Sequence, residues 1–338
     1  MENCKSVFVP FISIIMPAFN GENYISQAIE SVIRQKFESW ELLVVDDGST
    51  DSSQEIIYRY ANNDSRIKYI HQENKGEFDS RMTGIIHSKG EYITGLDQDD
   101  YMDNDYLETI YECIKKFHCD CIVSPYKSFG KSNEFFSLSD ESRLTDNCEL
   151  LLLVLKNNFP SFWCKTIKSS IYKGIDYSNV PLGIKSSAED YLMTIPAICE
   201  CKTVYLCNKG LLYYRDYEAS YSHNYTPKVI EDLYSISMYG IIEIEKRDML
   251  TEEVKKNEYI TLLNSVAYRL INIFSKGIMS VEDFEGIYIH KNYGLSKEYE
   301  MNRELGILQV LVLKLFRHRR YKALRCLSCL YTSIHAGR

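Results

Sequence analysis

The chain has 338 residues, 45% of them hydrophobic and 25% charged, which is enough for one large or two smaller globular domains with a sizeable core. The net charge is −8, and residues 305–338 carry seven Lys or Arg and no acid, so residues 1–304 carry −15. Such an acidic body excludes a nucleic-acid-binding protein by charge. Eleven scattered cysteines form no disulfide-like framework and favour a reducing cytoplasm, and no stretch approaches the ~20 apolar residues of a membrane span.

Residues 1–125 alternate between two patterns. Buried apolar runs predict strands at residues 12–19, 41–51, 66–72, 91–96 and 119–125. Apolar residues at helical spacing predict helices at residues 23–35, 53–61, 78–88 and 105–117. Strands that alternate with helices indicate βαβ units, and hence an α/β fold with a doubly wound, mostly parallel, Rossmann-like sheet.

The pattern is looser after residue 130. It indicates helices at 149–157 and 186–198, and strands at 161–167 and from residue 210. From Pro227 onward the sequence favours helix only, with helices predicted at 228–247, 252–275 and 305–331 and a capping box at Ser280 and Asp283. We therefore expect two domains, residues 1–225 and a helical C-terminal region of residues 226–338.

Polar residues gather at the carboxyl ends of three of the predicted strands, at residues 17–20, 46–51 and 97–100. In doubly wound sheets, ligands bind beyond the carboxyl ends of the strands. We therefore expect the functional site where these three strand ends meet.

Five aspartates crowd into residues 97–105: Asp97, Asp99, Asp100, Asp103 and Asp105. Like charges this close repel one another and destabilise a folded chain unless something cationic offsets them. A calcium loop that begins at Asp97 is disfavoured, because its sixth position is Met102 where the sharp turn needs glycine. A phosphatase site in VVDDGST is disfavoured as well, because Asp46 and Asp47 are adjacent and point to opposite faces of a strand.

Asp97 and Asp99 are separated by one residue at a strand end, so both carboxylates can face the same side. Such oxygens, together with water, suit Mg²⁺ or Mn²⁺, whose remaining ligands are typically the phosphates of a substrate. The cation would neutralise the diphosphate of a nucleotide-sugar and stabilise it as a leaving group. Asp47, at a neighbouring strand end, could accept a hydrogen bond from a base or ribose. Neither GxGxxG nor GxxxxGK followed by Ser or Thr occurs at a strand–helix turn, which argues against dinucleotide and P-loop folds.

The sequence resembles the family 2 glycosyltransferases, inverting enzymes of the GT-A fold. The resemblance is carried by SIIMPAFNGENYISQAIESVIRQKFESWELLVVDDGSTD, NKGEFDSRMTGI, GEYITGLDQDDY, AEDYLM and YYRDYEASYS. It covers residues 11–125 closely and residues 186–222 in patches. The motifs are specific in combination and in order, and each alone is not.

The resemblance implies a role for each of nine residues. Pro17, Glu22 and Asp47 would line the pocket for the nucleotide base, Asp97 would contact the ribose, and Asp99 would bind the metal. Arg81 would approach the base or the diphosphate, Asp190 would be the general base, and Arg215 and Ser220 would belong to a loop that folds over the diphosphate. The chain departs from the family pattern at Phe78 and Met82, which stand where Ser and Asn are common beside the arginine.

The chemistry of Asp190 agrees with the role that the resemblance implies. The segment SSAEDYLM is expected to open a helix with Ser186 or Ser187 near its N-cap, and the helix dipole keeps a carboxylate there ionised. An ionised aspartate can take the proton from an acceptor hydroxyl while that oxygen attacks the anomeric carbon. An ordinary helix-start cap is the alternative for Asp190. For His223, a plain surface histidine is the alternative to a metal or phosphate ligand.

Together these inferences predict a metal-dependent inverting transferase that moves a hexosyl or N-acetylhexosaminyl group from a UDP-sugar to a hydroxyl of a glycan or lipid-linked acceptor. The setting would be capsule, exopolysaccharide or other surface-glycan synthesis. A non-catalytic subunit of the same fold that binds nucleotide or glycan is one alternative, and a two-carboxylate glycosidase is another.

Residues 305–331 mix an apolar stretch with basic residues. This is typical of a helix that lies on the inner surface of the cell membrane, and also of a core helix with a solvated cationic face. The sequence leaves the oligomeric state open.

Overall fold

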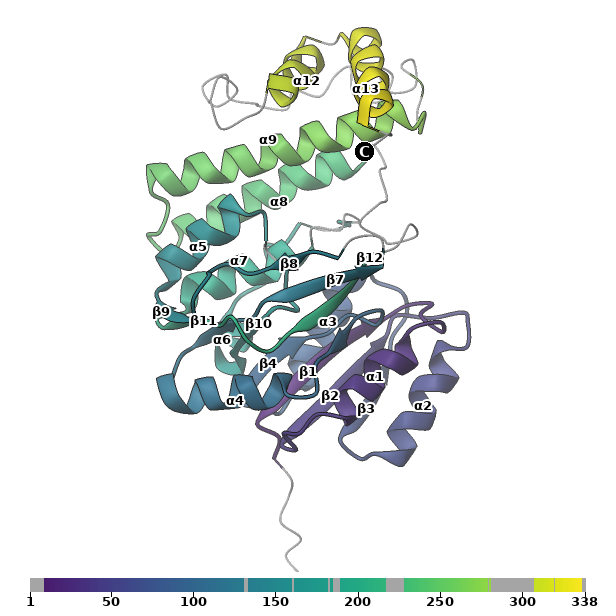
Figure 1. Cartoon of the computed structure of the whole chain (residues 1–338), viewed down its shortest axis with the longest axis vertical. Coiled ribbons are helices and arrows are strands. Elements are labelled where there is room, and N and C mark those ends of the chain that lie inside the picture. The colour runs from purple at the N-terminus through teal and green to yellow at the C-terminus, as the bar shows by residue number, and fades with distance from the viewer. Residues whose placement is uncertain are drawn as a thin grey trace, which may run out of the picture. The chain divides into compact units, whose positions relative to one another are not determined.

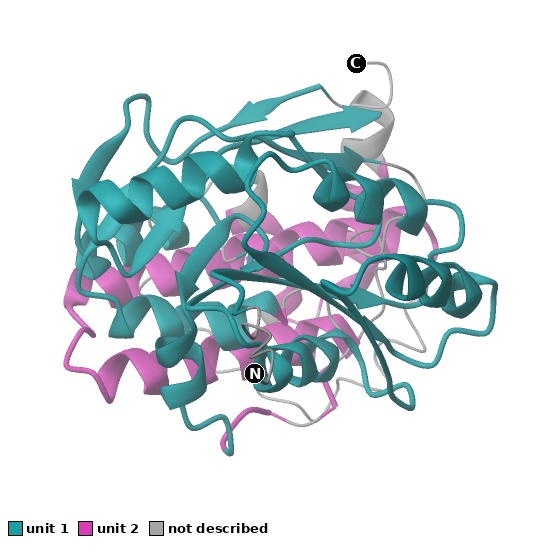
Figure 2. Ribbon diagram, turned by 90° about the horizontal axis from the view of Figure 1, so that it is seen from below, with its two compact units in different colours: residues 1–178, 190–218 teal, residues 179–189, 219–338 magenta. Residues whose placement is uncertain are grey.

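The computed structural model describes residues 9–130, 133–159, 161–181, 183–184, 189–216, 228–278, 280, 307–318 and 320–335. The chain divides into two compact units, residues 1–178 with 190–218 and residues 179–189 with 219–338 (Figure 2). The boundary predicted between residues 225 and 226 falls outside the described residues and stays a prediction, as does the capping box, because Asp283 is also outside them.

The larger sheet of unit 1 has the strand order β3-β2-β1-β4-β10-β6-β11-β9 (Figure 1). Its strands are β1 (Ile12–Ala18), β2 (Trp40–Asp46), β3 (Ile67–His71), β4 (Tyr92–Gly95), β6 (Cys121–Val123), β9 (Arg143–Thr145), β10 (Lys165–Lys168) and β11 (Val204–Leu206). Strands β3, β2, β1 and β4 pair in parallel, which confirms the predicted α/β sheet. Strand β10 pairs antiparallel with both β4 and β6, so the sheet is mixed, although mostly parallel.

The helices of unit 1 are α1 (Ile25–Ile33), α2 (Ser53–Asn63), α3 (Glu77–His87), α4 (Tyr106–Phe117), α5 (Asn147–Lys156), α6 (Ser169–Gly174) and α7 (Asp190–Glu200). Helix α3 packs on β1 and β2. Gly84 allows this close approach, since a Cβ at that position would lie 2.5 Å from Cγ2 of Ile15. Helix α7 begins at Asp190, and the predicted caps Ser186 and Ser187 lie outside the described residues.

Strands β1 and β2 are buried along their whole length, as expected for parallel strands covered on both faces. The polar side chains in them find partners within the core. Ser13 donates its hydroxyl hydrogen to Glu41 at 2.6 Å and accepts the backbone N–H of Gly90 at 2.8 Å. Pairing of this kind removes most of the cost of burying a polar group.

A smaller sheet of unit 1 has the order β5-β12-β7-β8. Its strands are β5 (Tyr101–Met102), β7 (Tyr126–Gly130), β8 (Phe135–Phe136) and β12 (Leu212–Asp216). Strand β5 lies within the acidic segment of residues 97–105 and pairs with β12. This pairing brings Arg215 beside the aspartates, although more than a hundred residues separate them in sequence.

Unit 2 is helical, with α8 (Lys228–Glu245), α9 (Glu252–Ser275), α12 (Ile307–Arg317) and α13 (Tyr321–His335) among the described residues. The single helix predicted for residues 305–331 is wrong, because the structure has two helices there, both packed on α9. Nothing in the local sequence predicts an interruption of the helical pattern between residues 317 and 321. In the part of the chain that the structure describes, no helix is long and apolar enough to cross a membrane.

Candidate functional site

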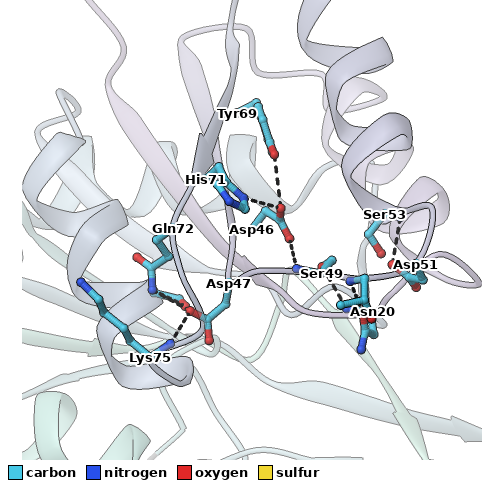
Figure 3. A network of polar contacts seen from close by, with 12 residues as sticks. Asn20, Asp46, Asp47, Ser49, Asp51, Ser53, Tyr69, His71, Gln72 and Lys75 are labelled. Atoms are coloured by element: carbon cyan, nitrogen blue, oxygen red, sulfur yellow. Dashed lines mark hydrogen bonds and ion pairs between the residues drawn. The ribbon is translucent and has the colours of Figure 1, made fainter.

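Asp47, at the end of β2, is buried and holds the loop that leads into α3 (Figure 3). One carboxylate oxygen accepts hydrogen bonds from the Gln72 side chain at 2.7 Å and the Lys75 backbone at 2.9 Å. The other oxygen accepts the Gly76 backbone N–H at 2.8 Å. A carboxylate has about four acceptor positions, so these three bonds fix the group and leave room for one ligand donor.

Asp46 points away from Asp47 (Figure 3). It accepts the Ser49 backbone N–H at 3.0 Å and lies 2.9 Å from Nδ1 of His71 and 3.2 Å from the Tyr69 hydroxyl. Adjacent residues of an extended strand face opposite sides. The paired acids that a phosphatase site would need are therefore not formed.

Side-chain bonds tie together the ends of β1, β2 and β4, which confirms that the three predicted polar clusters meet. Gln98, after β4, accepts the Phe19 backbone N–H at 3.0 Å and donates to the Phe19 carbonyl at 2.9 Å. Asn20, after β1, accepts the Thr50 backbone N–H at 2.8 Å. A Cβ on Gly21 would lie 2.1 Å from the Gln98 amide oxygen, so a larger residue there would displace the Gln98 side chain from these bonds.

Pro17 and Glu22 lie at the same edge as these strand ends. Pro17 is buried in β1 and is in register with Val45 of β2. Glu22 is exposed; its side chain accepts the Ser52 backbone N–H at 3.0 Å, and its own N–H donates to Asp51 at 3.1 Å. Both residues are therefore at the predicted mouth, with Glu22 fixing the loop after β2.

Arg81 is one of the cations placed beside the acidic segment. It lies on α3, is only 1% exposed, and donates to Asp97 at 2.9 Å and to Glu77 through one terminal nitrogen. Its other terminal nitrogen contacts Asp190. The structure thus brings together three predicted site residues from three separate elements: Arg81, Asp97 and Asp190.

Asp190 has both carboxylate oxygens engaged. One contacts Arg81, and the other accepts the Phe162 backbone N–H at 3.1 Å. Phe162 precedes β10, and its ring lies 5.4 Å from the guanidinium carbon of Arg81. A carboxylate held in this way has a fixed orientation at the first residue of α7, where the helix dipole also favours its ionised form.

Arg81 does not fully neutralise the negative charge of the aspartates that follow β4. Burial raises the pKa of the Asp97 carboxyl to about 7; Arg81 opposes this rise, while Glu77 and Asp99 add to it. Burial, with Asp99 and Asp97 nearby, also raises the pKa of Asp100 well above its ordinary value. Excess negative charge of this kind favours binding of a further cation.

Arg215, on β12, is fixed against the same acidic segment. Its backbone N–H donates to Asp100 at 2.8 Å, and its Nε donates to the Asp99 carbonyl at 2.8 Å. The guanidinium carbon lies 4.6 Å from the ring centres of both Tyr24 and Phe129. A flat cation fixed in this way suits a phosphate-bearing ligand. The other two residues assigned to this region, Ser220 and His223, lie outside the described residues.

The donor set near Asp99 consists of carboxylate oxygens, which suits Mg²⁺ or Mn²⁺. Within the described residues, no group of three or more His, Cys, Asp or Glu is arranged to hold a metal ion. The buried Oδ2 atom of Asp100 has no hydrogen-bond partner. These residues fit a cation that takes most of its ligands from water and substrate phosphates, as Mg²⁺ usually does.

Two functional contacts were missed from the sequence. Gln98 joins two strand ends, and its place between Asp97 and Asp99 was a usable signal. Phe162 acts through its backbone N–H, which any residue type supplies, so no sequence signal pointed to it.

Residues 13–175 match the family described as Glycosyl transferase family 2. The glycosyltransferase GlyA of Streptococcus pneumoniae is 35% identical over 64% of this chain and 32% of its own length. GlyG of the same organism is 30% identical over 50% of this chain and 60% of its own length. The alignments thus span about a third to three fifths of these relatives. The putative colanic acid biosynthesis glycosyl transferase WcaA of Escherichia coli is 47% identical over 27% of this chain and 33% of its own length.

Solved structures agree with the fold. Residues 1–349 of TarS from S. aureus superpose with a TM-score of 0.68 at 20% identity, covering 97% of this chain and 92% of that one. The structure of the same TarS fragment in complex with UDP-GlcNAc has a TM-score of 0.62 at 20% identity and covers 95% of this chain and 91% of that one. A mannosyltransferase of Pyrobaculum calidifontis in complex with GDP-Man and Mn²⁺ has a TM-score of 0.50 at 12% identity and covers 96% of this chain and 88% of that one. These similarities confirm the predicted α/β fold followed by C-terminal helices.

Proposed function

We propose that this chain, whose residues 13–175 match glycosyl transferase family 2, transfers one sugar from a UDP-sugar to a hydroxyl of a glycan or lipid-linked acceptor, with inversion. The transferred group is a hexosyl or N-acetylhexosaminyl group, and the product belongs to a capsule, exopolysaccharide or other surface glycan. The names of relatives such as WcaA support the setting, and the UDP-GlcNAc complex of TarS supports the donor class.

The contact of Arg81 with both Asp97 and Asp190 supports this proposal most directly. Asp97 lies at the strand end where a nucleotide would bind, and Asp190 lies at the start of α7. One buried guanidinium therefore fixes the proposed donor residue and the proposed base relative to each other. Without such a link, Asp190 would be an ordinary helix-start residue.

In the proposed donor site, Asp47 accepts a hydrogen bond from the base, with Pro17 and Glu22 beside it, and Asp97 binds the ribose. Arg215 and Ser220 bind the diphosphate. A divalent cation, Mn²⁺ or Mg²⁺, held by Asp99 and the diphosphate would stabilise the leaving group. The mannosyltransferase structure with Mn²⁺ supports the choice of cation, and the oxygen ligands in this chain suit it.

The proposed reaction is a single displacement. Asp190, oriented by Arg81 and the Phe162 N–H, removes the proton of the acceptor hydroxyl as that oxygen bonds to the anomeric carbon. The bond from the anomeric carbon to the UDP oxygen breaks, and the electron pair leaves with UDP. Attack opposite the leaving group inverts the configuration, so no enzyme nucleophile is required. In this scheme Arg81 is a positioning residue, because it acts through Asp97 and Asp190.

We place the reaction in the cytoplasm, which the free thiols of the described cysteines support.

The test is UDP release from a panel of UDP-sugars with Mn²⁺ present, with UDP binding measured in parallel by calorimetry. Wild type should bind UDP and release it from at least one donor. Asp99→Ala should abolish release, and Asp190→Asn should abolish release while UDP still binds. Asp105→Ala is the matched control, because this exposed aspartate of the same segment makes no side-chain capping bond. Binding of UDP by a wild type without turnover would instead indicate a non-catalytic subunit, and no UDP binding at all would refute the proposed donor class.

A further inference from the structure

The two C-terminal helices use their apolar side chains within unit 2. Val312, Leu313 and Phe316 of α12 and Tyr321 and Leu324 of α13 are buried in one core with residues of α8 and α9. These side chains are therefore not free to enter a bilayer. The amphipathic pattern of this region reflects packing on α9, and any contact with a partner has to use the opposite sides of the helices.

The exposed positions of these helices, outside that core, include basic residues. The exposed positions are Lys314 and His318 from α12 and the residue after it, Arg320 between the helices, and Lys322 and Arg325 on α13. We call these five residues the cationic face. Spacings of four residues from 314 to 318 and three from 322 to 325 place each pair on one side of its helix.

The segment that carries this charge is itself free of acidic residues. Residues 305–338 contain no Asp or Glu, whereas residues 1–304 carry a net charge of −15. A negatively charged surface therefore repels most of the molecule and attracts the cationic face. Leu311 and Cys326, both exposed on the same helices, add short apolar side chains that headgroups can cover without deep insertion.

We propose that the cationic face docks on an anionic lipid bilayer by electrostatic contact, without insertion of a helix. Charge complementarity favours this occupant, since anionic lipids attract surface Lys and Arg and the attraction fades within a Debye length. The burial of the apolar sides on α9 distinguishes this mode from an amphipathic helix that lies within the interface. The proposal goes beyond the proposed reaction and does not depend on it.

The test is sedimentation of the full chain with vesicles of phosphatidylcholine alone or mixed with phosphatidylglycerol. The protein should bind only the mixed vesicles at low salt, and should be released at 0.5 M salt, an added concentration at which the Debye length is about 4 Å. The variant K322E/R325E should bind at least roughly tenfold more weakly, because each cation near an anionic surface contributes roughly a fivefold factor. The variant K89E/K202E is the matched control, because it reverses two exposed lysines of unit 1 with the same change in net charge.

Three outcomes would overturn the proposal. Equal binding of wild type and K322E/R325E would exclude the cationic face, and no binding to either vesicle would exclude a lipid partner. Complete displacement from vesicles by inorganic polyphosphate at an equal concentration of negative charge would identify a general polyanion site instead. UDP release in the absence of vesicles should be the same in K322E/R325E as in wild type, so failure of docking is distinguishable from failure of the proposed reaction.

Discussion

Replacement of Arg81 with methionine tests the central contact of the site. Methionine keeps much of the length of the arginine stem and removes the charge, so Asp97, Asp190 and Glu77 lose their common cation. Breaking a buried ion pair by removing one partner typically costs about 3–5 kcal/mol of unfolding free energy. The Arg81 side chain is 2% exposed, but its carboxylate partners keep 17% to 34% of their surface, so we expect the lower end, about 3 kcal/mol.

Urea unfolding followed by tryptophan fluorescence measures this loss. The chain has two tryptophans, Trp40 and Trp163, and both are buried in unit 1, so the signal reports on the unit that contains Arg81. Asp97→Asn should be more favourable for stability in the Arg81→Met background than in wild type, with a coupling of about 1 kcal/mol or more. A loss below about 1 kcal/mol for Arg81→Met, or strict additivity with Asp97→Asn, would refute the assignment of Arg81 as the counter-charge of this segment.

Three further predictions concern separate parts of unit 1. Burial lowers the pKa of Lys165 from 10.5 to about 8. Because the unfolded chain then binds more protons between pH 8 and pH 10.5, the free energy of unfolding of the wild type should rise with pH across that window. Lys165→Met should reduce this dependence on pH by up to about 1.4 kcal/mol per pH unit, as measured by urea titrations at pH 8.5 and 9.5. An equal pH dependence in wild type and Lys165→Met would contradict a lowered pKa for the buried amine. Gly84→Ala should lower the free energy of unfolding by about 1–3 kcal/mol, because its Cβ meets Ile15, whereas Gly174→Ala, with open space around it, should change it by less than about 0.5 kcal/mol. Asp47→Ala leaves the backbone N–H groups of Lys75 and Gly76 without their acceptor, so it should lower the free energy of unfolding by about 1–3 kcal/mol. The same variant should bind UDP more weakly in calorimetry. An unchanged UDP affinity would remove Asp47 from the proposed donor site.

The strands and helices of the first 120 residues were predictable because their burial follows a local rule. A parallel strand covered on both faces has to be apolar throughout, and β1 and β2 are. The meeting of the polar clusters after β1, β2 and β4 followed from the same topology. The position of the site at this edge of the sheet could therefore be predicted from the sequence.

The remaining features depend on contacts that leave no local pattern. Strands β5 and β8 have two residues each, and they exist because β12 and β7 pair with them. The contact of Arg81 with Asp190 joins positions 109 residues apart, and the Phe162 N–H that holds Asp190 is a backbone group. A sequence pattern can identify such residues as candidates, but it cannot pair them.

The reciprocal bonds between Gln98 and the backbone of Phe19 span 79 residues of chain. Contacts of such long range form slowly, because the entropy of closing a large loop is lost before the contact contributes any stability. During synthesis, the edge of the proposed donor site cannot be complete until β4 has left the ribosome and inserted beside β1. A nascent or truncated chain that stops before residue 98 would contain the Asp47 loop but would lack this closure, and would be exposed to premature association through the open edge of β1.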